Sequence, residues 1–229
     1  MSFILNLETA TPVCSVALAR DGQMVSIREV NNGFTHSENI TNFIREVCSE
    51  SGIKPAEIDA VAVSSGPGSY TGLRIGLSTA KGLCYALNKP LIAVSTLQSM
   101  CECYLNEYTP DDANALLIPM IDARRMEVYT AGFDNNVKEI IAPMAMVIND
   151  HSFSDVLAGR SIIYFGDGAS KCQDVLSKSG MAKFADVAIS AKGMVAISEK
   201  KFRAKEFEDV SLFEPFYLKE VAIGKPAAS

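Results

Sequence analysis

The sequence lacks the patterns that would point to several common chemistries. Its six cysteines include no Cys-x-x-Cys pair, and a globular chain of 24.7 kDa does not need disulfide staples, so we expect reduced thiols in a cytoplasmic protein. There is no Gly-x-Ser-x-Gly elbow. The only histidines, His36 and His151, are expected to be solvated or capping residues. A Ser-His-Asp relay would therefore have no well-placed histidine to act as its base.

Basic residues are in the minority. Lysine and arginine number 21 against 27 acidic residues, which gives a net charge of -6 and a pI near 5.0. Because Lys and Arg neutralise phosphates in nucleic-acid complexes, this balance argues against RNA binding by the chain alone. The apolar start, Met1 to Leu7, lacks a basic leader and is too short for a signal segment or a membrane span, so we expect no membrane contact.

What the chain does have is 48% hydrophobic residues, enough to bury a large core. Its first half predicts the order βββαβαβα, in which Arg20-Asp21-Gly22 indicates a hairpin and Thr35 with Glu38 predicts a capping box ahead of the first helix. The predicted strands cover residues 3–7, 13–18, 24–28, 59–64 and 91–95, and the predicted helices cover residues 36–50, 69–87 and from about 96 to 108.

After a break at residues 110–112 the same order begins again. Strands are predicted over residues 115–121, 126–133, 137–141 and 162–165, and helices from about 152, after 168 and over 194–207. We therefore predict an α/β protein with a duplicated ribonuclease-H-like, two-lobed fold of the actin and sugar-kinase type, divided into a lobe of residues 1–109 and a smaller lobe of residues 110–229. In such folds a carboxylate at the end of the first strand of each lobe faces the cleft between the lobes. Glu8 and Asp122 occupy these places, although both can also be turn residues.

The glycine-rich stretch over residues 64–87 is the most informative part of the chain. It does not match a phosphate-binding P-loop. Gly66 and Gly68 are best explained as a sharp turn from strand to helix, although the first N–H groups of that helix could also hold an anion. Within the helix, Gly72, Gly76 and Ala80 recur every fourth residue and form one ridge. The two helical glycines cost roughly 2 kcal/mol against alanine, and a closely packed neighbour must compensate. That neighbour lies either in the same fold or in another subunit, and the sequence does not decide which.

Five segments resemble the TsaB family, formerly called YeaZ. They are ILNLETATPVCSVAL, SSGPGSYTGLRIGLSTAKGL, IDARRMEVY, FGDGA and EPFYLKE, and they span nearly the whole chain in the family's order. The resemblance implies a subunit of the bacterial machinery that makes N6-threonylcarbamoyladenosine beside the anticodon of tRNAs reading A-starting codons. In that machinery the related subunit TsaD transfers the threonylcarbamoyl group, TsaE is an ATPase, and TsaC makes the threonylcarbamoyl adenylate.

The resemblance also implies how the chain works. TsaB is a scaffold whose glycine-rich helix and preceding amphipathic helix bundle with the same helices of TsaD, or of a second TsaB copy when TsaD is absent. TsaE joins this complex, and tRNA is contacted only through it. Carried onto this sequence, the partner interface comprises His36, Ile40, Phe43, Ile44, Val47, Tyr70, Gly72, Leu73, Gly76, Leu77, Ala80 and Cys84.

The chain departs from TsaD where TsaD binds its metal. TsaD has an Asn-His-x-Glu-x-x-His type stretch, and the two histidine positions correspond here to Thr96 and Met100, so neither a metal site nor catalysis is expected. Cys101 and Cys103 point to different faces of one helix and are expected to be small apolar residues. Weak binding of ATP or ADP at the complex interface stays open. The candidate residues for it are Glu8, Asp122, Gly166 and Gly168.

Two other functions compete with the scaffold. An actin-like small-molecule kinase or ATPase acting alone would use Glu8 and Asp122 and would turn over ATP. A ribonuclease-H-like nuclease would need several carboxylates converging on two metals, and Glu8, Asp59 and Asp122 are spread over strand ends in different lobes. A basic cluster over residues 200–205 could touch tRNA in the complex, but a charge run of this kind is usually a solvated face.

Overall fold

The first half of the chain builds a five-stranded sheet with the strand order β3-β2-β1-β4-β5 in a computed structural model, which describes residues 1–33, 35–153, 160–179 and 182–219. The three leading strands pair antiparallel, and β4 and β5 add on in parallel to β1. The predicted hairpin is confirmed at Asp21 and Gly22, both with positive φ. The strands are β1 (Phe3–Glu8), β2 (Val13–Arg20), β3 (Gln23–Asn31), β4 (Ala60–Ser64) and β5 (Leu91–Val94).

The second half repeats this sheet. Its order, β8-β7-β6-β9-β10, has the same pattern of antiparallel and parallel pairs, so the predicted duplicated ribonuclease-H-like fold is confirmed. The strands are β6 (Leu116–Asp122), β7 (Glu127–Phe133), β8 (Glu139–Val147), β9 (Ile162–Phe165) and β10 (Ala182–Ala185). The prediction missed β10, because a half-buried four-residue run gives no clear alternation of polar and apolar side chains.

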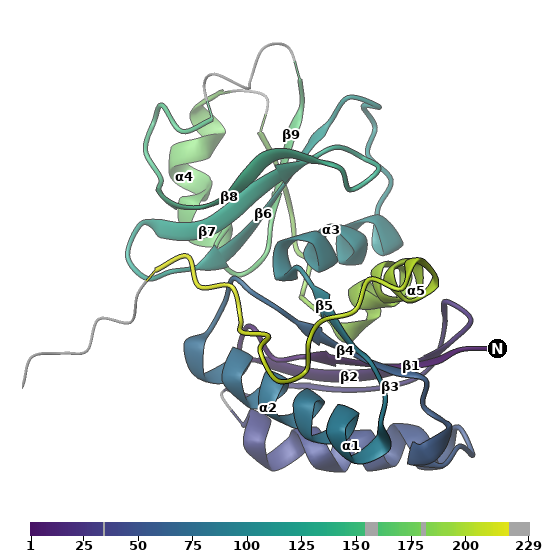
Figure 1. The fold of residues 1–229 in the computed structure, drawn as a ribbon. Helices are drawn as coiled ribbons and strands as arrows, with labels where there is room; N and C mark the ends of the chain where they lie inside the picture. The colour runs from purple at the N-terminus through teal and green to yellow at the C-terminus, as the bar shows by residue number, and fades with distance from the viewer. Residues whose placement is uncertain (34, 154–159, 180–181, 220–229) are drawn as a thin grey trace, which may run out of the picture.

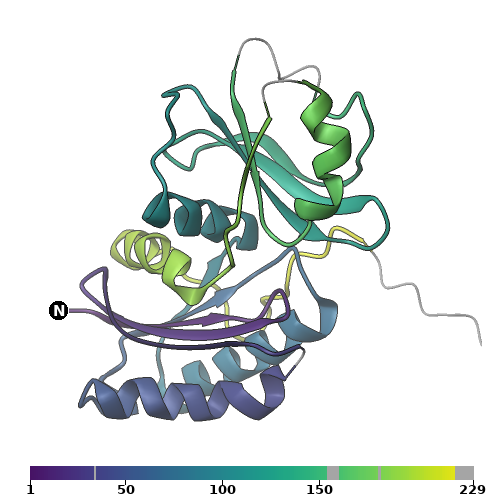
Figure 2. The same ribbon diagram turned by 180° about the vertical axis from the view of Figure 1, so that it is seen from behind.

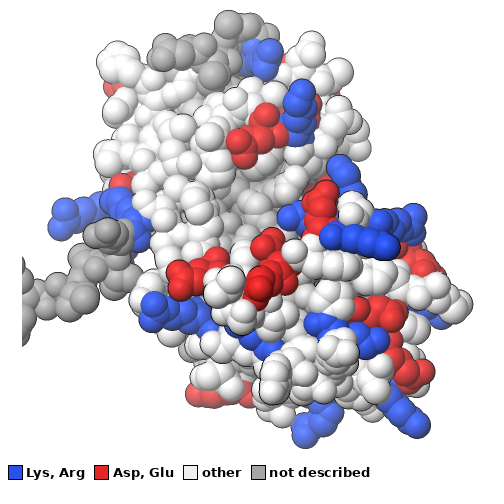
Figure 3. Space-filling model, in the orientation of Figure 1, with Lys and Arg blue, Asp and Glu red and all other residues white. Residues whose placement is uncertain are grey.

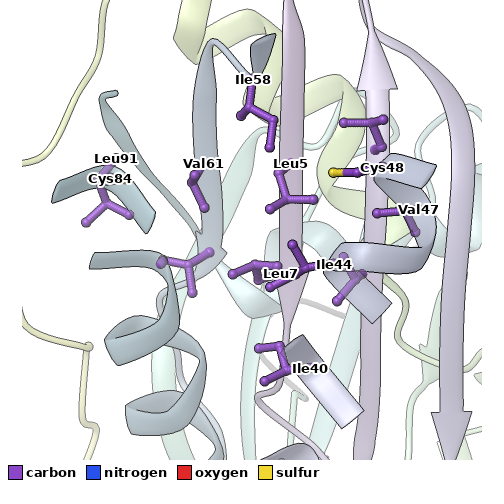
Figure 4. Close-up of a cluster of buried hydrophobic side chains, with 14 of the residues drawn as sticks. Leu5, Leu7, Ile40, Ile44, Val47, Cys48, Ile58, Val61, Cys84 and Leu91 are labelled. Carbon is purple, nitrogen blue, oxygen red and sulfur yellow. The ribbon is translucent and has the colours of Figure 1, made fainter. Parts of the chain in front are cut away.

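Two long helices, α1 (His36–Glu50) and α2 (Tyr70–Leu87), cover the outer face of the first sheet (Figure 1). Apolar residues spaced three or four positions apart on α1 pack inward against Leu5 and Leu7 of β1, as the periodicity predicts (Figure 4). Ile40 and Ile44 are two of these anchors. The predicted capping box is wrong, however: the Thr35 hydroxyl accepts a hydrogen bond from the Asn39 side chain (2.9 Å) and makes no cap to the backbone.

The two inner helices are exchanged between the lobes. Helix α3 (Thr96–Glu107) follows the first sheet in sequence but packs on the second, where Leu97 and Tyr104 join the core around Phe165. Helix α5 (Val195–Ala204) follows the second sheet but packs on the first, where Val195 and Ile197 cover the inner sides of β1, β2, β4 and β5. Figures 1 and 2 both place these helices between the two sheets.

This exchange corrects two placements expected from sequence. The helix predicted over residues 194–207 was assigned to the second lobe, and the helix after residue 95 to the first; each instead covers the opposite sheet. Amphipathic periodicity specifies that a helix has a buried side, but not which sheet it covers. The division at residues 109 and 110 separates the two sheets in sequence and stays a prediction as a division into domains.

The remaining helices are short. The helix predicted after residue 168 is a broken turn of 3-10 and α structure around α4 (Gln173–Leu176), on the outer side of the second sheet (Figure 2). The helix predicted from about residue 152 falls largely on residues 154–159, outside the described part of the chain. Within the described residues no helix is long and apolar enough to cross a bilayer. Charges of both signs are interspersed over the face in Figure 3.

Candidate partner interface and interlobe cleft

The glycine ridge of α2 faces inward, against the first lobe. A Cβ on Gly72 would lie 2.1 Å from the carbonyl oxygen of Thr9, and one on Gly76 would lie 2.2 Å from the Thr9 hydroxyl. That hydroxyl donates a hydrogen bond of 2.8 Å to the carbonyl oxygen of Gly72. The loop after β1 thus packs directly on the helix backbone, and only glycine leaves room for it. Of the two explanations left open by the sequence, the intramolecular one accounts for the ridge.

Most residues predicted for the partner interface are buried in the chain's own core. This group comprises His36, Ile40, Ile44, Val47, Gly72, Leu73, Gly76, Leu77, Ala80 and Cys84, while Phe43 and Tyr70 are half-buried. His36 was expected to be solvated or capping and is instead fully buried, where burial lowers the pKa of its imidazole despite a hydrogen bond to the Thr11 backbone. Most of the residues predicted for a partner interface on α1 and α2 therefore pack within the chain itself. Whether these two helices bind a partner stays a prediction.

The outward side of the same two helices forms a groove of about 540 Å³, which we call the α1–α2 groove. Its walls are mostly small or β-branched side chains, and Gly82 lies beyond it on α2, where an added Cβ would meet open space. Small side chains allow a second pair of helices to approach closely. The lining residues are Ser37, Ile40, Thr41, Tyr70, Thr71, Arg74, Ile75, Ser78 and Thr79. The sequence feature that could have predicted this groove is the row of polar and β-branched residues on α2 beside the glycine ridge.

Two cavities lie between the lobes, separated by the loop after β1, whose residues Thr11 and Pro12 line both. The first, of about 630 Å³, is lined by both apolar residues, such as Val187 and Ile189, and polar ones, such as Asp186, and its described lining residues include no Lys or Arg. The second, of about 710 Å³, opens beside the start of α2 and brings Arg124 together with several carboxylates. We call them cavity A and cavity B, respectively. Among the described residues that line them, neither cavity presents the cluster of unpaired cations that would favour a triphosphate.

Asp122 lies in cavity B, as expected for a residue ending the first strand of the second lobe. Its carboxylate is already engaged: Lys171 pairs with it, and the Arg124 backbone N–H donates to it at 2.8 Å. Although partial burial acts in the opposite direction, these hydrogen bonds lower the pKa of Asp122, so the group is ionised and partnered. Neighbouring Asp167 accepts from the Asp122 backbone N–H at 3.0 Å.

The two glycines of the Gly166-Asp167-Gly168 turn have structural explanations. A Cβ on Gly166, whose φ is +96°, would lie 2.5 Å from the carbonyl oxygen of Met120. One on Gly168 would lie 2.9 Å from the carbonyl carbon of Ile121. Both glycines therefore let the turn close onto β6, and only Gly166 lines a cavity.

Glu8 does not line either cavity, contrary to the expectation that it faces the cleft. Its side chain is fully buried; one carboxyl oxygen accepts from the Ala10 backbone N–H at 2.6 Å, and the other, Oε2, has no hydrogen-bond partner among the described residues. Burial raises the pKa of Glu8 from an ordinary 4.5 to about 7, although hydrogen bonds from Ala10 and Ser64 act in the opposite direction. Glu8 is therefore a buried acid that is protonated in the folded chain below neutral pH.

Replacing Glu8 by Gln is expected to remove one pH-dependent contribution to stability. A carboxyl whose folded pKa lies above its unfolded pKa contributes stability that is present below pH 4.5 and is lost as pH rises through 7. A shift from 4.5 to about 7 corresponds to a loss on the order of 3 kcal/mol. Urea denaturation of both chains at pH 5 and pH 8 should show the advantage of Glu8→Gln growing at pH 8, whereas a constant difference would contradict this placement of the charge.

Thr96 and Met100, the two positions at which the family resemblance led us to expect no metal site, have structural roles. The Thr96 hydroxyl accepts a hydrogen bond from the Gly66 backbone N–H at 3.2 Å, and Met100 packs under the Gly166 turn. Cys101 and Cys103 are buried, and burial raises the pKa of each thiol, as expected for apolar helix residues. Among the described residues, His, Cys, Asp and Glu form no group of three that could hold a metal ion.

Two side chains of the basic cluster over residues 200–205 are held by different partners within the chain. Lys201 extends under the first sheet and donates to the Ala93 carbonyl at 2.8 Å, and Arg203 pairs with Glu199 at 2.7 Å. Lys201 and Arg203 therefore do not form a shared surface of unpaired cations that could bind tRNA phosphates. The second histidine, His151, is exposed in a turn of the second lobe.

Comparison with known proteins gives consistent matches. A family model described as "TsaD: tRNA N6-adenosine threonylcarbamoyltransferase" matches residues 33–225. The "tRNA threonylcarbamoyladenosine biosynthesis protein TsaB" of Escherichia coli K12 is 31% identical over 227 residues, which cover 94% of each chain. The protein of the same description from Haemophilus influenzae is 36% identical over 126 residues, a match that covers 55% of this chain and about half (51%) of that protein. The solved structure "YeaZ from Pseudomonas aeruginosa" superposes with a TM-score of 0.77 over 95% of this chain and 100% of that one, at 24% identity.

Proposed function

This chain belongs to the TsaB (YeaZ) family and serves tRNA threonylcarbamoyladenosine biosynthesis, and we propose that within this process it is a non-catalytic scaffold subunit that pairs with TsaD. The α1–α2 groove is the observation that carries the proposal. It is an open surface on two neighbouring helices, lined mostly by small or β-branched side chains, and a four-helix bundle requires a surface of this kind.

Relatedness to TsaD supports the choice of partner. The TsaD family model matches this chain from just before α1 to beyond α5, so a TsaD subunit is expected to present equivalent helices. Two related surfaces of this kind pack about a near-twofold axis, with each groove receiving the other subunit's helices. A second copy of this chain fits the same arrangement when TsaD is absent, so the homodimer is part of the proposal.

The roles proposed for tRNA and TsaE follow from the net charge of the chain and from the state of its candidate nucleotide site. With a net charge of -6, the chain contacts tRNA only through the complex, and the ATPase TsaE supplies the nucleotide chemistry. We place the complex in the cytoplasm and assign no resident cofactor to this chain. Any ATP or ADP held at the complex interface would bind weakly, because Asp122 is already paired with Lys171 beside cavity B. That pairing also disfavours an actin-like kinase acting alone.

A reconstituted transfer assay tests the scaffold role. Purified TsaD, TsaE and TsaC from the same organism are combined with tRNA, threonine, bicarbonate and ATP, with and without this chain. We expect threonylcarbamoyl-tRNA to form at least about tenfold faster when the chain is present, and the chain alone to hydrolyse no ATP. Transfer at an equal rate without the chain would overturn the proposal, and ATP turnover by the chain alone would favour the kinase.

A further inference from the structure

The segment after α5 runs along the first lobe and crosses to the second. We call residues 208–219 the strap. It begins at the edge of the first sheet, where the Glu208 backbone N–H donates to the Leu91 carbonyl at 2.9 Å in an isolated antiparallel bridge. It then follows α2, with Val210 and Phe213 partly buried against the first core. In Figure 1 it is the yellow trace that leaves α5, passes α2 and rises toward the second sheet.

The strap is latched at the start of α2. The Phe216 backbone N–H donates to the Ser65 carbonyl at 2.7 Å, and a Cβ on Gly66 would lie 2.4 Å from the Phe216 carbonyl oxygen. One residue later, the ring of Tyr217 lies 5.0 Å from that of Tyr70. Gly66 is thus needed both for the turn, at φ +107°, and for the close approach of the strap.

Arg74 completes the latch. Its guanidinium lies over the Tyr70 ring at 3.9 Å, and its Nε donates to the Tyr217 hydroxyl at 3.3 Å. The strap ends on the other lobe, where Lys219 pairs with Glu127 of β7 at 2.6 Å. The strap therefore spans from the first sheet to the second, and its residues 216–219 form one wall of cavity B.

These attachments are of the kind that opens locally. Lys219 is half exposed and Phe216 is 49% exposed. The latch consists of one backbone hydrogen bond, the Arg74–Tyr217 hydrogen bond and contacts of two half-buried tyrosine rings. A surface ion pair, a single hydrogen bond and a single ring contact each contribute little to stability, so the strap can leave its site while both sheets stay folded.

The latch residues also belong to the α1–α2 groove. Tyr70 and Thr71 line both the groove and cavity B, and Arg74 lines the groove while holding Tyr217. We infer that the strap is a releasable gate over cavity B, and that occupancy of the α1–α2 groove shifts the strap between closed and open positions through Tyr70 and Arg74. The second part of this inference rests on the proposed function, because the occupant of the groove is a partner's helix pair.

Thiol labelling measures the gate without any partner. Ala123 is half-buried in the wall of cavity B, and the substitution Ala123→Cys gives a thiol there whose reaction with a maleimide is followed in the otherwise unchanged chain. The six native cysteines are buried and free, so the chain without the new thiol gives the background. Adding Tyr217→Ala should accelerate labelling about tenfold, since the rate follows the open population. Leu212→Ala, at a strap position that is 77% exposed, is the matched control and should change nothing.

A second variant tests the gate independently if Tyr217→Ala fails to fold. Lys219→Glu places a like charge beside Glu127 and loosens only the far end of the strap, so it too should accelerate labelling severalfold. Equal labelling rates in Tyr217→Ala, Lys219→Glu, Leu212→Ala and the parent would overturn the gate.

Coupling to the groove is tested separately. Binding of purified TsaD is measured by calorimetry for the parent, Tyr217→Ala and Leu212→Ala, and labelling of the thiol introduced by Ala123→Cys is repeated with saturating TsaD. We expect Tyr217→Ala to change TsaD affinity at least about threefold and TsaD to change the labelling rate. Binding with neither change would overturn the coupling alone. Absence of binding would overturn the proposed pairing and the coupling together, while the gate would still be decided by labelling without partner.

Discussion

Gly76→Ala will destabilise the chain, whereas Gly82→Ala in the same helix will stabilise it. In a solvent-exposed helix interior, alanine is better than glycine by about 1 kcal/mol, and Gly82, with no heavy atom within 4 Å of an added Cβ, should show this gain. At Gly76 the new methyl group would lie 2.2 Å from the Thr9 hydroxyl. Rotating Thr9 away would break its hydrogen bond to the Gly72 carbonyl inside the core. We therefore expect a loss of about 2–4 kcal/mol at this position.

Urea denaturation followed by circular dichroism distinguishes the two sites, because the expected free-energy changes have opposite signs. Bulkier Gly76→Leu should fail to fold, and its loss of partner binding would then carry no information about an interface. If Gly76→Ala were as stabilising as Gly82→Ala, the ridge would be exposed in solution and the inward orientation of α2 would be wrong.

The second large effect is expected on pairing. Ser78→Arg places a long cation on the exposed wall of the α1–α2 groove, where a helix pair packed into the groove would have to bury the charge and make room for its side chain. We expect TsaD affinity to fall at least about a hundredfold, roughly 3 kcal/mol, and tRNA threonylcarbamoylation to fall with it. The melting temperature should stay unchanged, because Ser78 is exposed in the isolated chain.

Ser177→Arg provides the matched control for this experiment. Ser177 is also exposed and receives the same substitution, but it lies beyond α4 on the second lobe, away from α1 and α2. Calorimetry with TsaD and size-exclusion chromatography of the free chain would report heterodimer and homodimer separately. Unchanged affinity in Ser78→Arg would place the interface elsewhere, and equal losses in both variants would indicate a general effect of the added charge.

The sequence predicted the elements of the fold better than their mutual orientation. Periods of two and of about 3.6 residues identified the leading strands and the long helices to within a few residues, because the apolar positions of these elements are sharply patterned. The side toward which the small residues of α2 face was not predictable in the same way. An exposed strip and a tightly packed one both favour glycine, and only the position of Thr9 distinguishes them.

The candidate site was predicted in part. The placement of Asp122 at a strand end in the cleft followed from the duplicated order, and it holds. Glu8, at the equivalent place, is fully buried and lines neither cavity, and its position at a strand end did not predict this burial. The groove and the strap were missed, since both depend on side chains that meet only after distant parts of the chain pack together.

The exchange of α3 and α5 has a consequence for how the chain is made. The inner face of the first sheet, including Ile4 and Ala62, is covered by residues 191–197 and so stays bare until most of the polypeptide has left the ribosome. A nascent chain that has emerged only as far as β5 would display this apolar face to chaperones and to other nascent chains. Biogenesis of the first lobe is thus tied to completion of the second, and a translation arrest within β6 to β9 would leave an aggregation-prone half-protein rather than a folded one.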